Sequence, residues 1–176
     1  MRLKMLASAV FMAAPFLLLG AYANATEFSA KLVGFEETPL AIFSKGTGTL
    51  DLKLDRRART ITFKLIFSGL SGPAQASHIH FGKRHVGGGV TVFFCGGGGR
   101  PACPSGVGAV GTPVTGTITG ANVIGLAGQA LPAGDFDALV AIIESDTAYA
   151  NVHTPNHPGG EIRGQIRRPE RDDDDK

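Results

Sequence analysis

Hydrophobic and polar residues alternate along most of this chain, which is the pattern of β-strands that bury one face. Residues 26–34 read TEFSAKLVG, in which the nonpolar residues Phe28, Ala30 and Leu32 alternate with polar ones. The same period recurs in residues 48–55 and 58–70, and the DRRA turn between them predicts an antiparallel hairpin. Further strands are predicted at residues 76–81, 89–95, 112–120, 148–154 and 161–167.

One helix is predicted among these strands. Asp135 can cap its N-terminus, and the apolar residues that follow it recur at the spacing of one helix face. These residues are Phe136, Leu139, Val140 and Ile143. Elsewhere 25 glycines and 10 prolines separate short strand-like segments, which is typical of a sandwich or barrel. The predicted fold class is therefore all-β: an antiparallel β-sandwich or barrel, of immunoglobulin-like or superoxide-dismutase-like architecture, with one short helix.

The N-terminus has the features of a secretory signal peptide. A basic start (Arg2 and Lys4) precedes an apolar run, and Ala23 and Ala25 each end a small-x-small cleavage site. The apolar run is short compared with the roughly 20 residues that span a bilayer. Residues 1–25 are therefore predicted to be cleaved. We expect a secreted or periplasmic protein with no membrane span after cleavage.

The charge balance of the mature chain argues against nucleic acid as a partner. Removing Arg2 and Lys4 from the 17 Lys and Arg leaves 15, which equals the 15 Asp and Glu. The short basic clusters lack the interleaved aromatic residues of nucleic-acid binders. The acidic tail at 169–176 is expected to be disordered, and its DDDDK resembles an enterokinase cleavage site left from cloning. The folded domain is thus predicted to span residues 26–168.

Cys95 and Cys103 are the only cysteines of the chain. In an oxidising compartment, two thiols that flank a loop rich in glycine and proline are expected to form a disulfide. Their spacing differs from that of a CxxC redox or metal motif. We therefore predict a Cys95–Cys103 disulfide.

Three of the five histidines lie in SHIHFGKRH, at residues 77–85. On a strand, His78 and His80 would project from the same face, because successive side chains alternate. Two imidazoles at this spacing can reach one ion, and imidazole is a good ligand for zinc and copper.

A second polar face is predicted near the C-terminus. Asn151 and His153 share one side of their strand, and Glu161 and Arg163 share one side of the next. His157 falls in the Pro/Gly connection between them and is a further candidate ligand. If the two histidine segments meet, three histidines are available to bind a metal ion. The side chains of Glu161, Asn151 and Arg163 could then surround these ligands and orient them.

Four stretches together resemble the CHRD family, a domain named from chordin and found in exported bacterial proteins: FSAKLVGFEETP, GTGTLDL, SHIHFG and NVHTPNHPGGEIRGQI. The similarity runs from Phe28 to Ile166. It implies a β-sandwich or barrel module of extracellular or periplasmic proteins, without an established general enzymatic activity. The positions that match the family motif are Glu37, His78, His80, Asn151, His153, Thr154, Gly160, Glu161, Arg163 and Gly164. Glu37 is followed by Thr38-Pro39 where many members have Pro-Pro, and similar sequences do not usually have a histidine at His85.

Two functional interpretations remain open at this stage. In the first, the histidines form a structural hydrogen-bonded cluster with Glu37 or Glu161, in an exported module that binds an unknown protein or matrix partner. In the second, His78, His80 and His153 bind copper or zinc, with superoxide-dismutase-like activity as an extension by analogy. A pH-sensitive interface is a third, weaker hypothesis. No catalytic residue is predicted, because the motifs of hydrolases and metalloproteases are absent from the sequence.

Overall fold

The structure is a computed structural model that describes residues 25–108 and 111–169. Its strands are β1 (Thr26–Val33), β2 (Thr47–Asp55), β3 (Thr60–Ser68), β4 (Ala76–Phe81), β5 (Gly89–Cys95), β6 (Val114–Ile118), β7 (Ala148–Thr154) and β8 (His157–Gln165). The helix α1 spans Phe136–Glu144, and short 3-10 turns lie at Gly34–Glu36, Gly120–Asn122 and Ala127–Gln129. The signal peptide predicted at 1–25 and the tail predicted at 169–176 lie, except for their innermost residues, outside the described residues.

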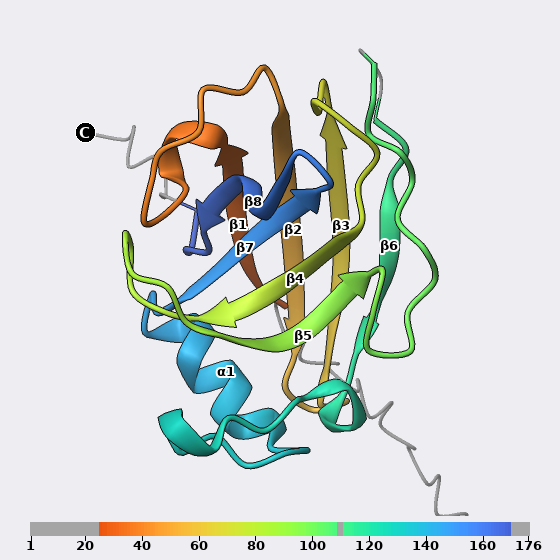
Figure 1. The fold of residues 1–176 in the computed structure, drawn as a ribbon. Helices are drawn as coiled ribbons and strands as arrows, with labels where there is room; N and C mark the ends of the chain where they lie inside the picture. The colour runs from red at the N-terminus through yellow and green to blue at the C-terminus, as the bar shows by residue number, and fades with distance from the viewer. Residues whose placement is uncertain (1–24, 109–110, 170–176) are drawn as a thin grey trace, which may run out of the picture.

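The eight strands form one antiparallel sheet in the order β5-β4-β7-β8-β1-β2-β3-β6. This sheet folds over on itself. Figure 1 shows β4, β5 and β7 crossing in front of β1, β2, β3 and β6. The result is a nearly closed barrel or sandwich with one helix, which confirms the predicted fold class.

The core lies between these two layers and follows from the alternation in the sequence. Leu50 on β2 pairs with Leu65 on β3, and both are fully buried, whereas their neighbours along each strand are exposed or half-buried. From the opposite layer, Ile79 and Val152 enter the same apolar cluster. Fully burying each of these side chains stabilises the fold by about 1.5–3 kcal/mol.

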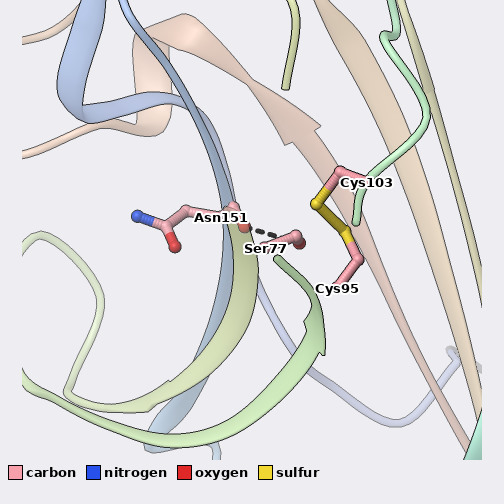
Figure 2. Close-up of a disulfide and its surroundings, with 4 residues drawn as sticks. All are labelled: Ser77, Cys95, Cys103 and Asn151. Carbon is pink, nitrogen blue, oxygen red and sulfur yellow. Dashed lines mark hydrogen bonds between the residues drawn. A yellow bond between two sulfur atoms is a disulfide. The ribbon is translucent and has the colours of Figure 1, made fainter. Parts of the chain in front are cut away.

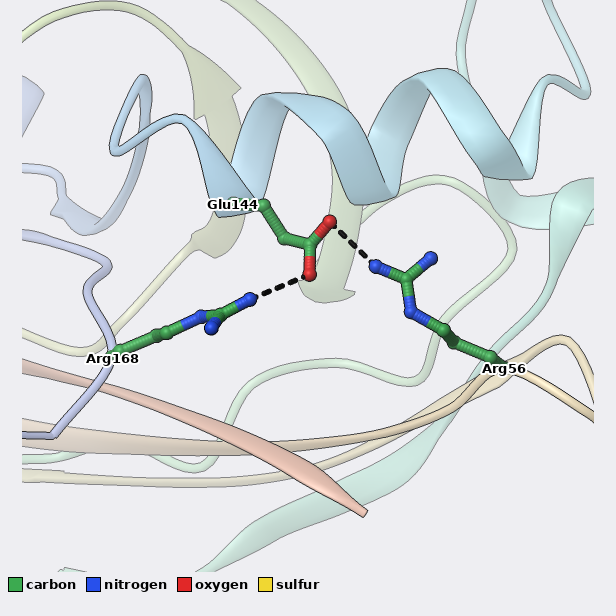
Figure 3. A network of polar contacts seen from close by, with 3 residues as sticks. All are labelled: Arg56, Glu144 and Arg168. Atoms are coloured by element: carbon green, nitrogen blue, oxygen red, sulfur yellow. Dashed lines mark hydrogen bonds and ion pairs between the residues drawn. The ribbon is translucent and has the colours of Figure 1, made fainter. Parts of the chain in front are cut away.

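Helix α1 covers one end of the sandwich (Figure 1). The Asp135 side chain accepts a hydrogen bond from the backbone N–H of Ala138 at 2.9 Å, which confirms the predicted cap. At the other end of the helix, Glu144 pairs with Arg56 at 2.6 Å and with Arg168 at 2.9 Å (Figure 3). These ion pairs connect α1 to the β2–β3 turn and to the segment after β8. No helix within the described ranges is long and apolar enough to cross a membrane.

The predicted Cys95–Cys103 disulfide is confirmed, with an S–S distance of 2.02 Å. It fastens the end of β5 to the following loop (Figure 2). Cys95 pairs in register with Ser77 on β4, and the Ser77 hydroxyl donates to the Asn151 carbonyl on β7 at 2.7 Å. The covalent link therefore adjoins the strand pair that carries the histidines.

Candidate metal centre

The two histidine segments lie side by side, because β4 pairs with β7. In this register His78 is opposite Asn151, His80 is opposite Tyr149, and His153 is opposite Ala76. Ile79, between the two β4 histidines, is fully buried in the apolar core. Side chains alternate along a strand, so the histidines project from the other face of the layer.

The three imidazole rings form a compact group on that face. The ring centroid of His78 lies 4.6 Å from that of His80 and 4.6 Å from that of His153, whereas His80 and His153 are 6.5 Å apart. One ring nitrogen from each histidine lies within 4.8 Å of the other two. Ligands about 2.0–2.1 Å from one zinc ion would be roughly 3–3.5 Å apart, so the nitrogens need to approach by on the order of 1 Å.

Backbone carbonyls hold two of these rings in the tautomer of a metal ligand. His80 Nδ1 lies 2.8 Å from the Gly88 carbonyl, and His153 Nδ1 lies 2.9 Å from the Pro158 carbonyl. A carbonyl oxygen only accepts hydrogen bonds, so each Nδ1 carries the proton and donates it. The Nε2 lone pair of each ring is then available, and histidines that bind metals typically have such an outer hydrogen bond.

Two buried nitrogens of the group have no hydrogen-bond partner among the described residues: His78 Nδ1 and His153 Nε2. An unsatisfied buried polar atom costs about 1–3 kcal/mol. His80 Nε2 lies 3.1 Å from Asn151 Oδ1. His80 donates through Nδ1 and so has only a lone pair at Nε2, and Oδ1 cannot donate; these two atoms therefore form no hydrogen bond in this orientation of the amide. Each histidine thus offers one ring nitrogen as a candidate metal ligand, and these nitrogens lie within 4.8 Å of one another.

Burial keeps the three rings neutral, which is the form that binds metals. Burial, and then the neighbouring rings of His80 and His153, lower the pKa of His78 to about 3. Burial also lowers the pKa of His80 and that of His153.

An aromatic and cationic stack lies next to the group. The Tyr149 ring stacks on His80 with a centroid distance of 4.5 Å and an interplanar angle of 5°, and the Arg163 guanidinium lies 3.5 Å from the Tyr149 centroid. Arg163 is buried and donates to Thr38 Oγ1 at 2.6 Å and to two backbone carbonyls of the 83–86 loop at 3.0 and 3.1 Å. It therefore fastens two loops over this face. Tyr149 was not predicted as a site residue, although it lies two residues from Asn151 and therefore on the same face of the strand.

Glu161 lies in a separate hydrogen-bonded network. Its buried carboxylate accepts bonds from Ser44 Oγ at 2.6 Å, from Ser71 N and Oγ at 2.8 Å each, and from Thr154 Oγ1 at 2.7 Å. Burial acts to raise the pKa of Glu161, but these bonds outweigh it and hold the pKa below its usual value. None of these bonds involves a histidine, so Glu161 does not orient a ring of the candidate site by direct contact.

His157 is not in the three-histidine group. The expectation that it lies in a connecting loop was wrong, because β8 begins at His157 and the turn is confined to Pro155 and Asn156. The run of proline and glycine at 158–160 suggested a loop, yet these residues continue the strand. His157 instead lines a separate pocket together with Glu37.

Comparison with known proteins gives one family match. The family model described as "CHRD domain" matches residues 28–166. No curated protein matches, and no solved structure matches.

Proposed function

This chain belongs to the CHRD family, and from that premise we propose that it is an exported β-module that binds one copper or zinc ion through His78, His80 and His153. The observation that supports this most strongly is the pair of buried ring nitrogens without a hydrogen-bond partner, His78 Nδ1 and His153 Nε2. Both belong to the group whose ligand atoms lie within 4.8 Å of one another.

A purely structural histidine cluster fits these contacts less well. Buried polar groups in a structural network are normally satisfied, whereas here two buried ring nitrogens of neighbouring histidines have no partner among the described residues. One cation would satisfy both, together with His80 Nε2. The donor set consists of neutral imidazoles, which suits zinc and copper, whereas calcium and magnesium prefer oxygen ligands.

The bound ion would link two strands and stabilise the module. His78 and His80 lie on β4 and His153 lies on β7, so coordination joins segments that are far apart in the sequence. An ion that binds only the folded state, and is present at a free concentration of 100 times its Kd, adds about 2.7 kcal/mol to the free energy of unfolding. We propose that such a stabilised module serves a binding or structural role toward a protein or matrix partner outside the cell.

Metal titration of single-histidine variants tests this proposal. Metal-free protein titrated with Zn(II) or Cu(II) should take up one equivalent. His78→Ala and His153→Ala should each weaken this uptake at least tenfold, whereas His157→Ala is the matched control and should bind like the unmodified protein. Circular dichroism verifies that each variant is folded. Failure of the unmodified protein to bind either ion at micromolar concentration, or equal binding by all variants, would refute the proposal.

Superoxide dismutation is the enzymatic extension of the same site. It requires a redox-active copper ion and a route for the anionic substrate. Arg163, the buried cation that stacks on Tyr149 next to the cluster, donates its hydrogen bonds to Thr38 and to backbone carbonyls, and this does not favour a steering role. Copper-loaded protein should therefore show no more dismutase activity than copper-loaded His153→Ala; activity confined to the unmodified protein would instead establish the enzyme.

A further inference from the structure

A buried carboxyl group lies at a pocket separate from the three histidines. The Glu37 side chain is 6% exposed, and its Oε1 has no hydrogen-bond partner in the part of the chain that the structure describes. The pocket has a volume of about 240 Å³ and is lined by residues 37–40, 42 and 156–160. The pocket therefore has room for a small organic group.

The backbone of β8 shapes this pocket around the carboxyl group. Gly160 has a φ of +129°, and a Cβ added there would lie 2.5 Å from Glu37 Oε1 and 2.7 Å from Oε2. The carboxyl group thus occupies the space that a side chain at residue 160 would fill, and only glycine permits this approach. The position of the Glu37 carboxyl group is therefore set by the fold.

The nearest cation does not neutralise Glu37 through a direct bond. Burial raises the pKa of Glu37 to about 7, while the charge of Arg163 and a bond from the Thr38 backbone act in the opposite direction. The Arg163 guanidinium directs its own hydrogen bonds to Thr38 Oγ1 and to carbonyls of the 83–86 loop. A buried carboxylate without an ion-pair partner is unfavourable, so a ligand that brings a cation to this carboxyl group would be stabilised.

Exposed apolar side chains occur in the pocket wall and in the chain segments next to it. Leu40 in its wall is 74% exposed, and Phe35 and Phe43 nearby in the chain are 65% and 91% exposed. The two phenylalanine rings lie 6.1 Å apart. An apolar rim above a single acidic group suits a ligand with an apolar stem and a cationic end.

We propose that this pocket binds a primary ammonium group at the end of an apolar chain, as in a small alkylamine or a lysine side chain. The ammonium group donates to the Glu37 carboxyl group, and the methylene groups pack against Pro39 and Leu40. One carboxyl group is a poor site for calcium or magnesium, which take several oxygen ligands, but it matches one ammonium group.

Binding of n-pentylamine tests this proposal, with n-pentanol as the neutral analogue. At pH 8, ¹⁵N-labelled protein should show saturable NMR shift changes at residues 38–42 and 156–160 with the amine, and at least tenfold weaker changes with the alcohol. Glu37→Gln should weaken amine binding at least tenfold. Glu36→Gln is the matched control, because Glu36 is adjacent but pairs with Arg84 at the surface, and it should bind normally. An amine that coordinates a metal at the histidines would still bind Glu37→Gln, which separates the two sites.

Two further measurements identify the source of the ammonium group and the effect of protonating Glu37. A peptide with lysine between two phenylalanines, compared with its Nε-acetylated form, distinguishes a protein partner from a free amine. Affinity should fall as the pH drops below 7 and Glu37 gains a proton; Arg163, Tyr149 and His157 are the charged or titratable groups around it. Equal binding of pentanol, unchanged binding by Glu37→Gln, or no binding of pentylamine at millimolar concentration would overturn the proposal.

Discussion

Acid should destabilise the metal-free protein, because its clustered histidines are buried in the neutral form. His78 has a pKa of about 3 in the folded chain, against a usual value of 6.5. Between these values the unfolded chain binds a proton that the folded chain does not, so the free energy of unfolding falls as the pH drops through this window. Well above pH 6.5 His78 is neutral in both the folded and the unfolded chain, so it causes no loss of stability there.

The size of this effect follows from the two pKa values. At pH 4.5, two units below the unfolded value and still above the folded one, His78 alone removes about 2.7 kcal/mol, at 1.36 kcal/mol per unit. His78 is almost fully buried, so solvent screens little of this. Burial lowers the pKa of His80 and of His153 in the same direction, and the three rings titrate as a coupled group.

Urea unfolding followed by far-UV circular dichroism at pH 7.0 and 4.5, in the presence of EDTA, measures this loss. The unmodified protein should lose about 2–3 kcal/mol more than His78→Gln between the two pH values. His85→Gln is the control, because His85 is exposed, and it should behave like the unmodified protein. Carboxyl groups titrate in all three proteins and cancel in the comparison. If His78→Gln loses as much stability as the unmodified protein, the histidine is not buried in its neutral form and the reasoning fails.

Three other changes should alter stability to different extents, each measured by chemical denaturation at pH 7. Replacing Cys95 and Cys103 by serine removes a link across a sequence separation of 8 and should lower the free energy of unfolding by about 2.5 kcal/mol, from the loop-closure entropy; an unchanged midpoint would contradict this. Leu50→Ala should lower it by about 2–5 kcal/mol, because a fully buried side chain leaves a cavity. Glu144→Gln should lower it by less than about 1 kcal/mol, since its two arginine partners are exposed; a larger loss would show that these ion pairs are structural.

The local features of the fold were predictable from the sequence because they depend on neighbouring residues. Alternation located the strands, Asp135 marked the start of α1, and the two cysteines indicated their own pairing. The start of β8 at His157 was not predictable, because glycine and proline residues occur in loops and also at strand ends. The order of strands in the sheet was also not apparent, since the pairing of β4 with β7 joins segments about 70 residues apart.

The same limit applies to the candidate site. Alternation correctly placed Ile79 in the core and thus His78 and His80 on the opposite face. It did not indicate the carbonyls of Gly88 and Pro158 that hold two of the rings, because the loop that contains Gly88 and the first residues of β8, which include Pro158, take positions that depend on the whole fold. For Glu161, the sequence pattern suggested an outer partner of the histidines, whereas hydroxyl groups from distant loops bind its carboxylate.

The most direct test of the metal site is X-ray absorption spectroscopy of the zinc-loaded protein, which counts the imidazole ligands around the ion. The proposal predicts three imidazole nitrogens at about 2.0–2.1 Å, and one fewer in zinc-loaded His153→Ala. Fewer than three imidazoles in the unmodified protein, or a spectrum unchanged by that substitution, would contradict it.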